Sequence, residues 1–272
     1  MKIFIFLAFF ALSLYGIDIF QGKSEVIILE NIDKNSVVKF QNKVIKPIPN
    51  PLDKKQMLIL LPVDYKSLLG EYKLEYLHNN SKKSILIHVK KGIYKKEELR
   101  VNPKKVNPPK EMLEQIQKEY KEANAIYDTN GEKIYWAKPF IYPLESEITS
   151  NFGNARVFND TLKSYHSGVD FRAQVGTPIK ATNDGKVVLV KERYYAGGSV
   201  IIDHGNGLYS CYFHMSKFFV KVGDIVKQAE VLGLSGKSGR VTGPHLHFSF
   251  KLFNTTIDPL DFITKVNTSV FN

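Results

Sequence analysis

Histidine and aspartate residues in the second half of the chain have the types and spacing that metal chemistry needs. The segment His166–Asp170 (HSGVD) places an imidazole and a carboxylate four residues apart, and Gly168 allows the backbone to bend between them. His245 and His247 lie two residues apart in an apolar run. In a strand, side chains two apart share one face of the sheet. We therefore expect both rings to converge on one side.

Zinc is the metal that these side chains suit best. Imidazole and carboxylate are ligands for Zn²⁺, and a catalytic zinc site uses three protein ligands with one position left for water. Two histidines and one aspartate match that number. His214, which ends the apolar run Leu208–Phe213, belongs to the remaining histidines that are available to move protons.

Each pattern has a structural alternative when it is taken alone. The spacing of His166 and Asp170 is common by chance. The pair His245 and His247 is more specific, because two strand imidazoles on one face are costly to bury without a shared task. His204 precedes an Asn-Gly pair typical of a hairpin turn, so we interpret it as structural.

The elements that must position these residues follow from composition and patterning. Residues 1–16, a basic start and an apolar run, are typical of a secretory signal peptide, with an uncleaved anchor as the alternative. Short apolar runs separated by turns in residues 17–101 predict an immunoglobulin-like β module, a sandwich or barrel. Residues 102–138 combine a proline-bearing linker with an amphipathic helix at Lys110–Tyr127. We expect a catalytic domain at 139–264, followed by a tail at 265–272.

Bulk properties narrow the class of protein. Apolar residues make up 43% of the chain, enough for packed cores. The formal net charge of +11 is compatible with polyanionic partners, but the lysines are scattered, which favours solvated faces over a nucleic-acid surface. Cys211 is the only cysteine, so no internal disulfide can form, and its apolar neighbours predict a buried structural thiol.

A series of motifs in a fixed order fills the region from Ile148 to Asp261. The motifs are Ser150–Gly153 with Arg156, His166–Phe171, Gly176–Ile179, His204–Gly207, Tyr212–Met215, Val222–Val226, Gly233–Gly236 and Thr242–Phe248. Together they resemble the lysostaphin/LytM-type zinc metallopeptidase family, over a little under half of the chain. The resemblance implies a mainly β fold: an antiparallel β-sheet metallopeptidase domain, related to hammerhead and barrel-sandwich folds, beside the N-terminal β-sandwich-like module and the linking helix.

The resemblance also assigns roles to residues. It implies that His166, Asp170 and His247 bind one Zn²⁺ and that His214 and His245 are catalytic. We expect His245 to act as general base on water and His214 to stabilise the oxyanion or protonate the leaving amine, although the two roles are exchangeable.

Two further residues are candidates for substrate binding. Tyr212 is expected to line the cleft. Arg156 is expected either to contact a substrate carboxylate or to form a structural ion pair.

The implied activity is that of an exported peptidoglycan endopeptidase, or less often a carboxypeptidase, acting on stem peptides or cross-links. The expected location is the periplasm or envelope of a bacterium, with a Gram-negative cell favoured. We expect peptidoglycan peptides as partners, no nucleic acid and no stable membrane span after signal cleavage.

Alternatives to this activity remain open. The first is a non-catalytic regulator of another wall hydrolase, whose signature is a missing ligand. A lipoyl-like carrier is a second alternative, but Lys186 does not lie at the expected hairpin tip. Finally, the N-terminal region is a candidate autoinhibitor that would place an Asn, Glu or Asp side chain on the metal.

Overall fold

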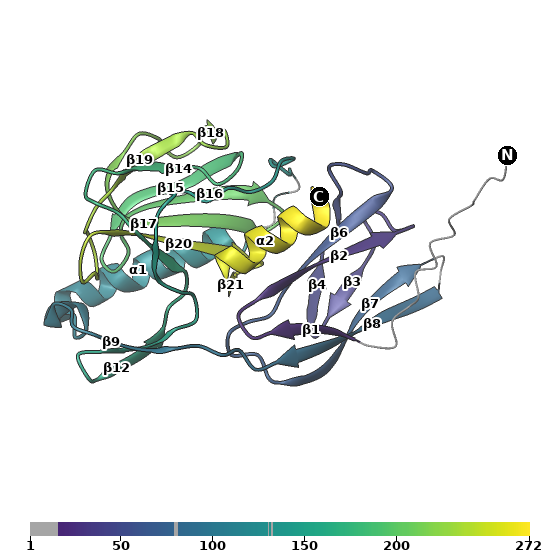
Figure 1. Ribbon diagram of the computed structural model, residues 1–272, viewed down its shortest axis with the longest axis horizontal. Coiled ribbons are helices and arrows are strands. Elements are labelled where there is room, and N and C mark those ends of the chain that lie inside the picture. Colours follow the sequence, from purple (N-terminus) through teal and green to yellow (C-terminus); the bar gives the residue numbers. More distant parts are fainter. Residues whose placement is uncertain (1–15, 79–80, 130, 132) are drawn as a thin grey trace.

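The computed structural model describes residues 16–78, 81–129, 131 and 133–272. The predicted signal peptide lies outside the described residues except for Gly16. Within the described ranges, no helix has the length and apolar character that crossing a membrane requires. Figure 1 shows two groups of strands, with α1 beside one of them and α2 lying where the two groups meet.

The N-terminal group consists of two sheets. One has the order β1-β8-β7-β3-β4 and the other the order β2-β6-β5. The strands are β1 (Ile17–Phe20), β2 (Ser24–Glu30), β3 (Val38–Phe40), β4 (Lys43–Ile45), β5 (Ile48–Pro49), β6 (Gln56–Pro62), β7 (Gly70–His78) and β8 (Ser81–Lys90). All pairings are antiparallel except that of β1 with β8.

Strand β6 connects two hydrophobic cores. Ile59 and Leu61 pack into the core of the N-terminal sheets, whereas Leu58 and Leu60 pack into the larger core that contains the C-terminal sheet. All four side chains are buried, so β6 is a continuous apolar run instead of an alternating one. The two halves of the chain are therefore held together by shared apolar packing.

The C-terminal group is built on a ten-stranded sheet. Its main path has the order β10-β13-β20-β17-β16-β15-β18, with β14, β19 and β21 paired at its margins. The bounds are β10 (Ile148–Ser150), β13 (Val169–Arg172), β14 (Pro178–Lys180), β15 (Gly185–Arg193), β16 (Gly197–Gly205), β17 (Leu208–Phe218), β18 (Ile225–Val226), β19 (Val231–Ser235), β20 (His245–Leu252) and β21 (Thr255–Ile257).

Two helices cover this sheet. Helix α2 (Pro259–Val270) is capped at its N-terminus by Asp258, whose carboxylate accepts hydrogen bonds from backbone N–H groups of the first turn. The helix packs against β20 and β2. Helix α1 (Lys110–Tyr127) has the bounds expected from its periodicity. It buries Ala123 and Tyr127 against β15, β16 and β17, and Cys211 of β17 is buried in the same cluster.

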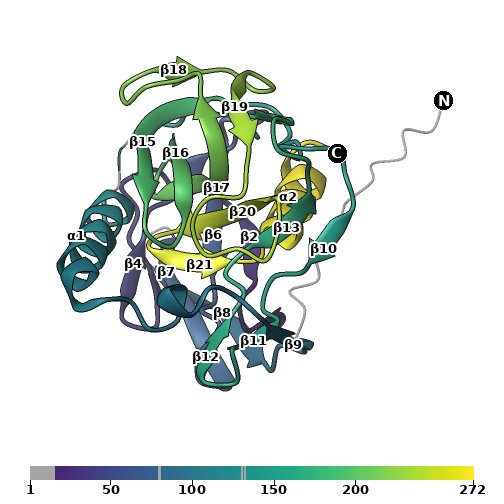
Figure 2. The ribbon, with the colours of Figure 1, turned by 90° about the vertical axis from the view of Figure 1, so that its left-hand side faces the viewer.

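A small third sheet joins the two halves. Strand β9 (Lys96–Leu99) pairs in parallel with β11 (Ala155–Phe158), and β11 pairs with β12 (Leu162–Tyr165). Figure 2 shows these strands next to one another beneath the main sheet. A 3-10 turn at Pro103–Lys105 follows β9.

The prediction of a mainly β fold with an antiparallel C-terminal sheet and a linking helix is confirmed. The predicted domain boundaries stay a prediction. The structure shows that β9, on the N-terminal side of the expected boundary at residue 101, hydrogen-bonds to β11 in the C-terminal half.

Candidate active site and metal centre

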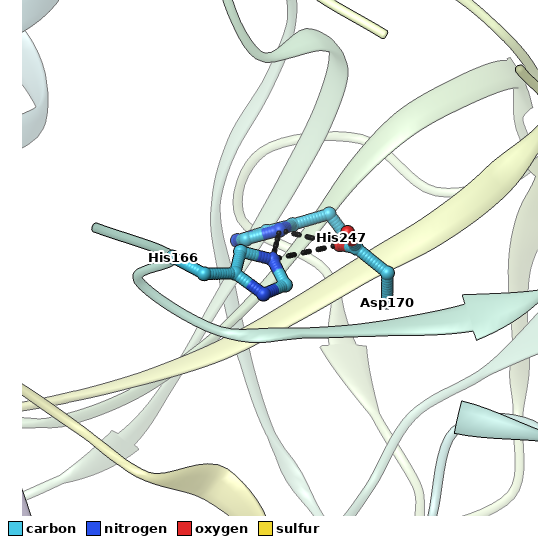
Figure 3. A group of neighbouring side chains, drawn as sticks. All are labelled: His166, Asp170 and His247. Atoms are coloured by element: carbon cyan, nitrogen blue, oxygen red, sulfur yellow. Dashed lines mark hydrogen bonds and ion pairs between the residues drawn. The ribbon is translucent and has the colours of Figure 1, made fainter. Parts of the chain in front are cut away.

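Three side chains converge at the junction of β13 and β20. Asp170 and His247 lie directly opposite each other in the antiparallel register, and His166 lies in the segment just before β13. His166 Nε2 is 2.9 Å from Asp170 Oδ1 and 3.0 Å from His247 Nδ1, which is itself 3.0 Å from the same carboxylate oxygen. Figure 3 shows the two rings and the carboxylate turned toward one centre.

Gly168 permits this close approach. A Cβ atom at position 168 would lie 2.3 Å from the carbonyl oxygen of Phe248 and 2.7 Å from His247 Nε2. Real Cβ atoms do not come so near to backbone, so a larger residue would push β20 and its histidine away from His166.

The hydrogen bonds and charges of this group leave its ligand atoms free to bind a cation. His166 Nδ1 lies 2.9 Å from the carbonyl oxygen of Asn151, so Nδ1–H donates there and Nε2 presents its lone pair to the centre. Burial lowers the pKa of His247 to about 4, which keeps that imidazole neutral at pH 7. Burial by itself would raise the pKa of Asp170, but His166 and His247 hold it well below its usual range.

The group fits zinc. Its three donor atoms form a triangle with edges of 2.9 to 3.0 Å. A tetrahedral site with bonds of about 2.0 Å requires edges of about 3.3 Å, so small shifts of the side chains would suffice. Two imidazoles and one carboxylate, all buried, are a ligand set that zinc accepts.

Arg156 and Glu97 form a chain of hydrogen bonds that fixes the orientation of Asp170. Arg156 Nη2 donates to Asp170 Oδ2 at 2.7 Å, and its Nε donates to Glu97 Oε2 at 2.9 Å. The other oxygen of Glu97 accepts from the hydroxyl of Ser150 and the amide of Asn154, both at 2.7 Å. Of the two alternatives for Arg156, the structural ion pair is the one that this geometry supports.

Glu97 is a site residue that the sequence did not indicate. It lies on β9, outside the region that carries the motifs, and reaches the site only because β9 pairs with β11, where Glu97 is the register partner of Arg156. Burial would raise its pKa, but hydrogen bonds from Ser150, Asn154 and Arg156 lower it, so the carboxylate stays charged.

His214 and His245 face the same centre. His245 Nδ1 is 2.9 Å from the carbonyl oxygen of Gly243, and His214 Nδ1 is 2.8 Å from that of Ser238. In each ring Nδ1–H donates to a carbonyl, which leaves Nε2 unprotonated in the neutral ring. His245 Nε2 lies 3.6 Å from Asp170 Oδ1, and the His214 and His245 ring centroids are 4.7 Å apart.

A β-bulge turns His214 toward the site. Two residues, 213 and 214, lie in β17 opposite the single residue 199 of β16, and His214 has a φ of +64°. Strict alternation would have placed His214 on the core face with Tyr212. The left-handed backbone at the bulge breaks that alternation, and such bulges often redirect side chains beside active sites.

Asp170, His214 and His245 line a cavity of about 240 Å³. Both sequence halves contribute to its walls. The lining residues are Glu97, Leu99, Val101, Thr149, Ser150, Arg156, Phe158, Asp170, His214, Arg240, Val241, Thr242, Gly243, Pro244 and His245.

Comparison with known proteins agrees with this geometry. Residues 164–259, which contain all five of the converging side chains, match peptidase family M23. The chain contains an M23 peptidase domain. A Pseudomonas aeruginosa protein assigned to peptidase M23 has a crystal structure that superposes with a TM-score of 0.69 at 26% identity, covering 93% of this chain and 96% of the other. Its likeness therefore extends beyond the M23 domain into the N-terminal sheets.

Two curated relatives match this chain over less than half of its length. The peptidoglycan DD-endopeptidase ShyA of Vibrio cholerae is 43% identical over 125 residues, which is 45% of this chain and 29% of ShyA. The glycyl-glycine endopeptidase ALE-1 of Staphylococcus capitis is 46% identical over 105 residues, which is 36% of this chain and 29% of ALE-1. The chain thus spans less than a third of the length of these relatives.

Tyr212 does not line the cleft of the M23 domain, so the expectation for this residue is wrong. Its side chain is 0% exposed, and its hydroxyl oxygen accepts hydrogen bonds from the Thr182 N–H at 2.9 Å and the Ser210 hydroxyl at 3.0 Å. Register explains the difference. Tyr212 pairs with Phe248 and shares its core face, whereas the next residue, Phe213, pairs with His247.

Loss of the Glu97 carboxylate is expected to weaken metal binding by the M23 domain. In Glu97→Gln the charged partner of Arg156 disappears, and Arg156 no longer holds Asp170 in one orientation. Changes in such supporting contacts lower metal affinity by about 10- to 100-fold. Competition with a chromophoric chelator measures the effect. Glu98→Gln, an exposed carboxylate of the same strand paired with Lys96, is the control and should bind zinc like the wild type.

His204, in the core of the M23 domain, has the structural role expected from the sequence. The ring is 0% exposed, with Nδ1 at 2.7 Å from the carbonyl oxygen of Asp184 and Nε2 at 2.8 Å from the hydroxyl oxygen of Ser210. Burial lowers its pKa from 6.5 to about 4.

His204 should make stability depend on pH. Between pH 6.5 and about 4 the unfolded chain binds a proton that the folded ring does not, so the free energy of unfolding is unaffected above pH 6.5 and falls as the pH drops toward 4. The loss is roughly 3 kcal/mol at most. Urea unfolding with a chelator present, compared with His204→Gln, isolates this contribution, since the other histidines remain in both proteins. Equal pH slopes for the two proteins would contradict it.

Proposed function

We propose that this chain is a zinc metallo-endopeptidase that hydrolyses peptide bonds in the stem peptides or cross-links of peptidoglycan. The observation that carries the proposal is the convergence of three donor atoms from His166, Asp170 and His247 within 3.0 Å of one another, with two further imidazoles at the same cavity. The description of ShyA as a peptidoglycan DD-endopeptidase supports the substrate.

The proposed chemistry divides tasks among the five residues. His166, Asp170 and His247 would hold Zn²⁺, which when bound polarises a carbonyl and lowers the pKa of water. His245 Nε2, unprotonated because Nδ1–H donates to Gly243, accepts the proton of the attacking water. His214 can stabilise the oxyanion or protonate the leaving amine only once its Nε2 carries a proton, and the proton that His245 takes from the water supplies it, since the two ring centroids are 4.7 Å apart.

The neutral resting state of His214 leaves its Nε2 free to accept a proton during the reaction. Burial lowers its pKa well below the usual range, and the neighbouring His245 and His247 lower it further. Its Nδ1–H bond to the Ser238 carbonyl fixes the ring, so Nε2 keeps its direction through the reaction.

Export and location belong to the same proposal. The basic and apolar start of the chain supports secretion, and a peptidoglycan substrate lies outside the bacterial cytoplasm. A periplasm, with a Gram-negative cell favoured, remains the proposed compartment. The relatives described above are named as endopeptidases, so carboxypeptidase activity is left out of the proposal.

A regulator without catalysis is less well supported. That alternative expects a missing ligand, whereas His166, Asp170 and His247 form the complete ligand group. His214 and His245 line the cavity next to Asp170. Autoinhibition by the N-terminal region stays a prediction. The nearest candidate carboxylate on β9, Glu97, has both oxygens bonded to Arg156, Ser150 and Asn154 instead of reaching across the ligand triangle.

Digestion of defined sacculi tests the proposed function. The purified full chain, loaded with zinc, is expected to cut peptide bonds of the sacculi, so that subsequent muramidase digestion yields muropeptides with new amino and carboxyl ends. Mass spectrometry of these muropeptides identifies the bond that is cut. The same protein treated with a chelator is the control, and zinc added back should restore cleavage. Intact sacculi after treatment with the zinc-loaded protein would refute the proposal.

A further inference from the structure

Arg240 is held between two aromatic rings in the wall of the active-site cavity. Its guanidinium carbon lies 4.5 Å from the centroid of the Phe158 ring and 4.8 Å from that of the Tyr195 ring. The side chain is half-buried and lines the same cavity as His214 and His245. Stacking on aromatic faces fixes a guanidinium plane while its N–H groups stay available for other partners.

This cation has no acidic partner within the described parts of the chain. The arginine ion pairs there are those of Arg100, Arg156 and Arg172. Arg156 lines the same cavity as Arg240 but differs from it in being paired with two carboxylates. Burial of an unpaired charge is costly, and burial lowers the pKa of Arg240. Arg240 therefore has unused donor capacity directed at the cavity.

The backbone around Arg240 is fixed as well. Its N–H donates to the carbonyl oxygen of Tyr195 at 2.8 Å. The preceding Gly239 has a φ of +82°, and a Cβ there would lie 2.4 Å from that same oxygen. The backbone at Gly239 and Arg240 therefore packs closely against Tyr195, which limits how far Arg240 can move.

The same loop orients both catalytic histidines. The carbonyl of Ser238 binds His214 Nδ1–H, and the carbonyl of Gly243 binds His245 Nδ1–H. Arg240 lies between these two residues in the sequence. A group bound to Arg240 would therefore be placed in a fixed relation to both proton-transferring rings.

We propose that Arg240 binds a carboxylate of the substrate close to the scissile peptide bond and so selects acidic over amidated peptides. The inference rests on the proposed endopeptidase function and adds a specificity-determining residue to it. A planar guanidinium can donate two parallel N–H···O bonds to a carboxylate. Phe158 and Tyr195 lie over the faces of the guanidinium, so they leave the N–H groups at its edge free for such bonds.

Three matched cross-linked peptides test this inference. The first keeps all carboxyl groups, the second is amidated at its C-terminal carboxyl group, and the third is amidated at the side-chain carboxyl group nearest the scissile bond. We expect the wild type to cleave one amidated peptide about 10- to 100-fold less efficiently in kcat/KM than the first peptide, because a charge-assisted contact is lost. The peptide that is affected identifies which carboxylate Arg240 binds.

Variants assign the preference to Arg240. Arg240→Gln should cleave all three peptides with similar kcat/KM, and Arg240→Lys should recover part of the preference. Arg100→Gln removes an exposed arginine already paired with Asp160 and should keep the full preference. Unchanged zinc content and thermal unfolding in each variant show that the site and the fold are intact.

Calorimetric binding separates failure of this inference from failure of the proposed function. Metal-depleted wild type should bind the carboxylate peptide with about 10-fold lower Kd than the affected amidated peptide, and Arg240→Gln should lose that difference. If the wild type shows this difference in Kd but the zinc-loaded protein cleaves none of the peptides, the proposed peptidase function is refuted and the carboxylate site is supported. Equal binding and equal cleavage of all three peptides by the wild type, or a preference kept by Arg240→Gln, would overturn the inference.

Discussion

His247→Ala is expected to bind no stoichiometric zinc and to lose at least about 10³-fold in kcat/KM on peptidoglycan peptides. The variant removes one of three buried donor atoms and leaves His166 and Asp170, a pair too small for a catalytic zinc site. Zinc supplies several kcal/mol of charge stabilisation in the transition state, which corresponds to a loss of this size.

Metal analysis and steady-state kinetics on the same preparations measure this effect. His88→Ala is the matched control, because it removes a histidine of β8 that pairs with Asp18, away from the cavity. The control should keep one zinc per chain and wild-type kinetics. A His247→Ala protein that still holds one zinc, with kinetics like those of the control, would show that His247 is not a ligand.

His245→Ala should give a different result, with kcat lowered by about 10²- to 10⁴-fold and zinc content unchanged. This range is typical for the loss of a general acid or base. His245 Nε2 is 3.6 Å from Asp170 Oδ1, whereas the corresponding distances for His166 and His247 are 2.9 and 3.0 Å. His245 therefore lies outside the ligand triangle but near enough to act on a water at its open side.

Comparison with His214→Ala and with the double variant shows whether the two histidines act together. If they serve one proton-transfer sequence, the double variant should be scarcely slower than the worse single variant, because the effects of cooperating groups are not additive. Loss of zinc from His245→Ala would contradict the assignment, since it would make His245 a ligand. Full activity of His245→Ala with zinc retained would remove it from the chemistry.

Short sequence patterns predicted the helices and strands whose conformation is set by nearby residues in the sequence. The apolar spacing in Lys110–Tyr127 predicted helix α1, and the two-residue spacing of His245 and His247 predicted a strand with both rings on one side. These predictions succeed because helical and strand periodicity are properties of a short segment. The family motifs indicated five residues, and the structure places three of them in the ligand group and the other two beside it.

Tyr212 and His214 show where local periodicity fails. Two residues apart in one strand, they would share one face under strict alternation, but the bulge at residues 213 and 214 separates them. A bulge arises from the register between β16 and β17, which no single segment specifies. Tyr212 consequently points into the core and His214 into the cavity.

The sequence by itself determined the mainly β class, the linking helix and the identity of the residues able to hold a metal. Tertiary structure alone decided that Glu97 and Asp170 pair with Arg156 and that Arg240 has no acidic partner among the described residues. The physical reason is that charge pairing across β9, β11 and the loop at Ser238–Gly243 depends on contacts between segments far apart in the chain. Residue types and spacing show which groups are available, and long-range packing determines which of them remain free to meet a substrate.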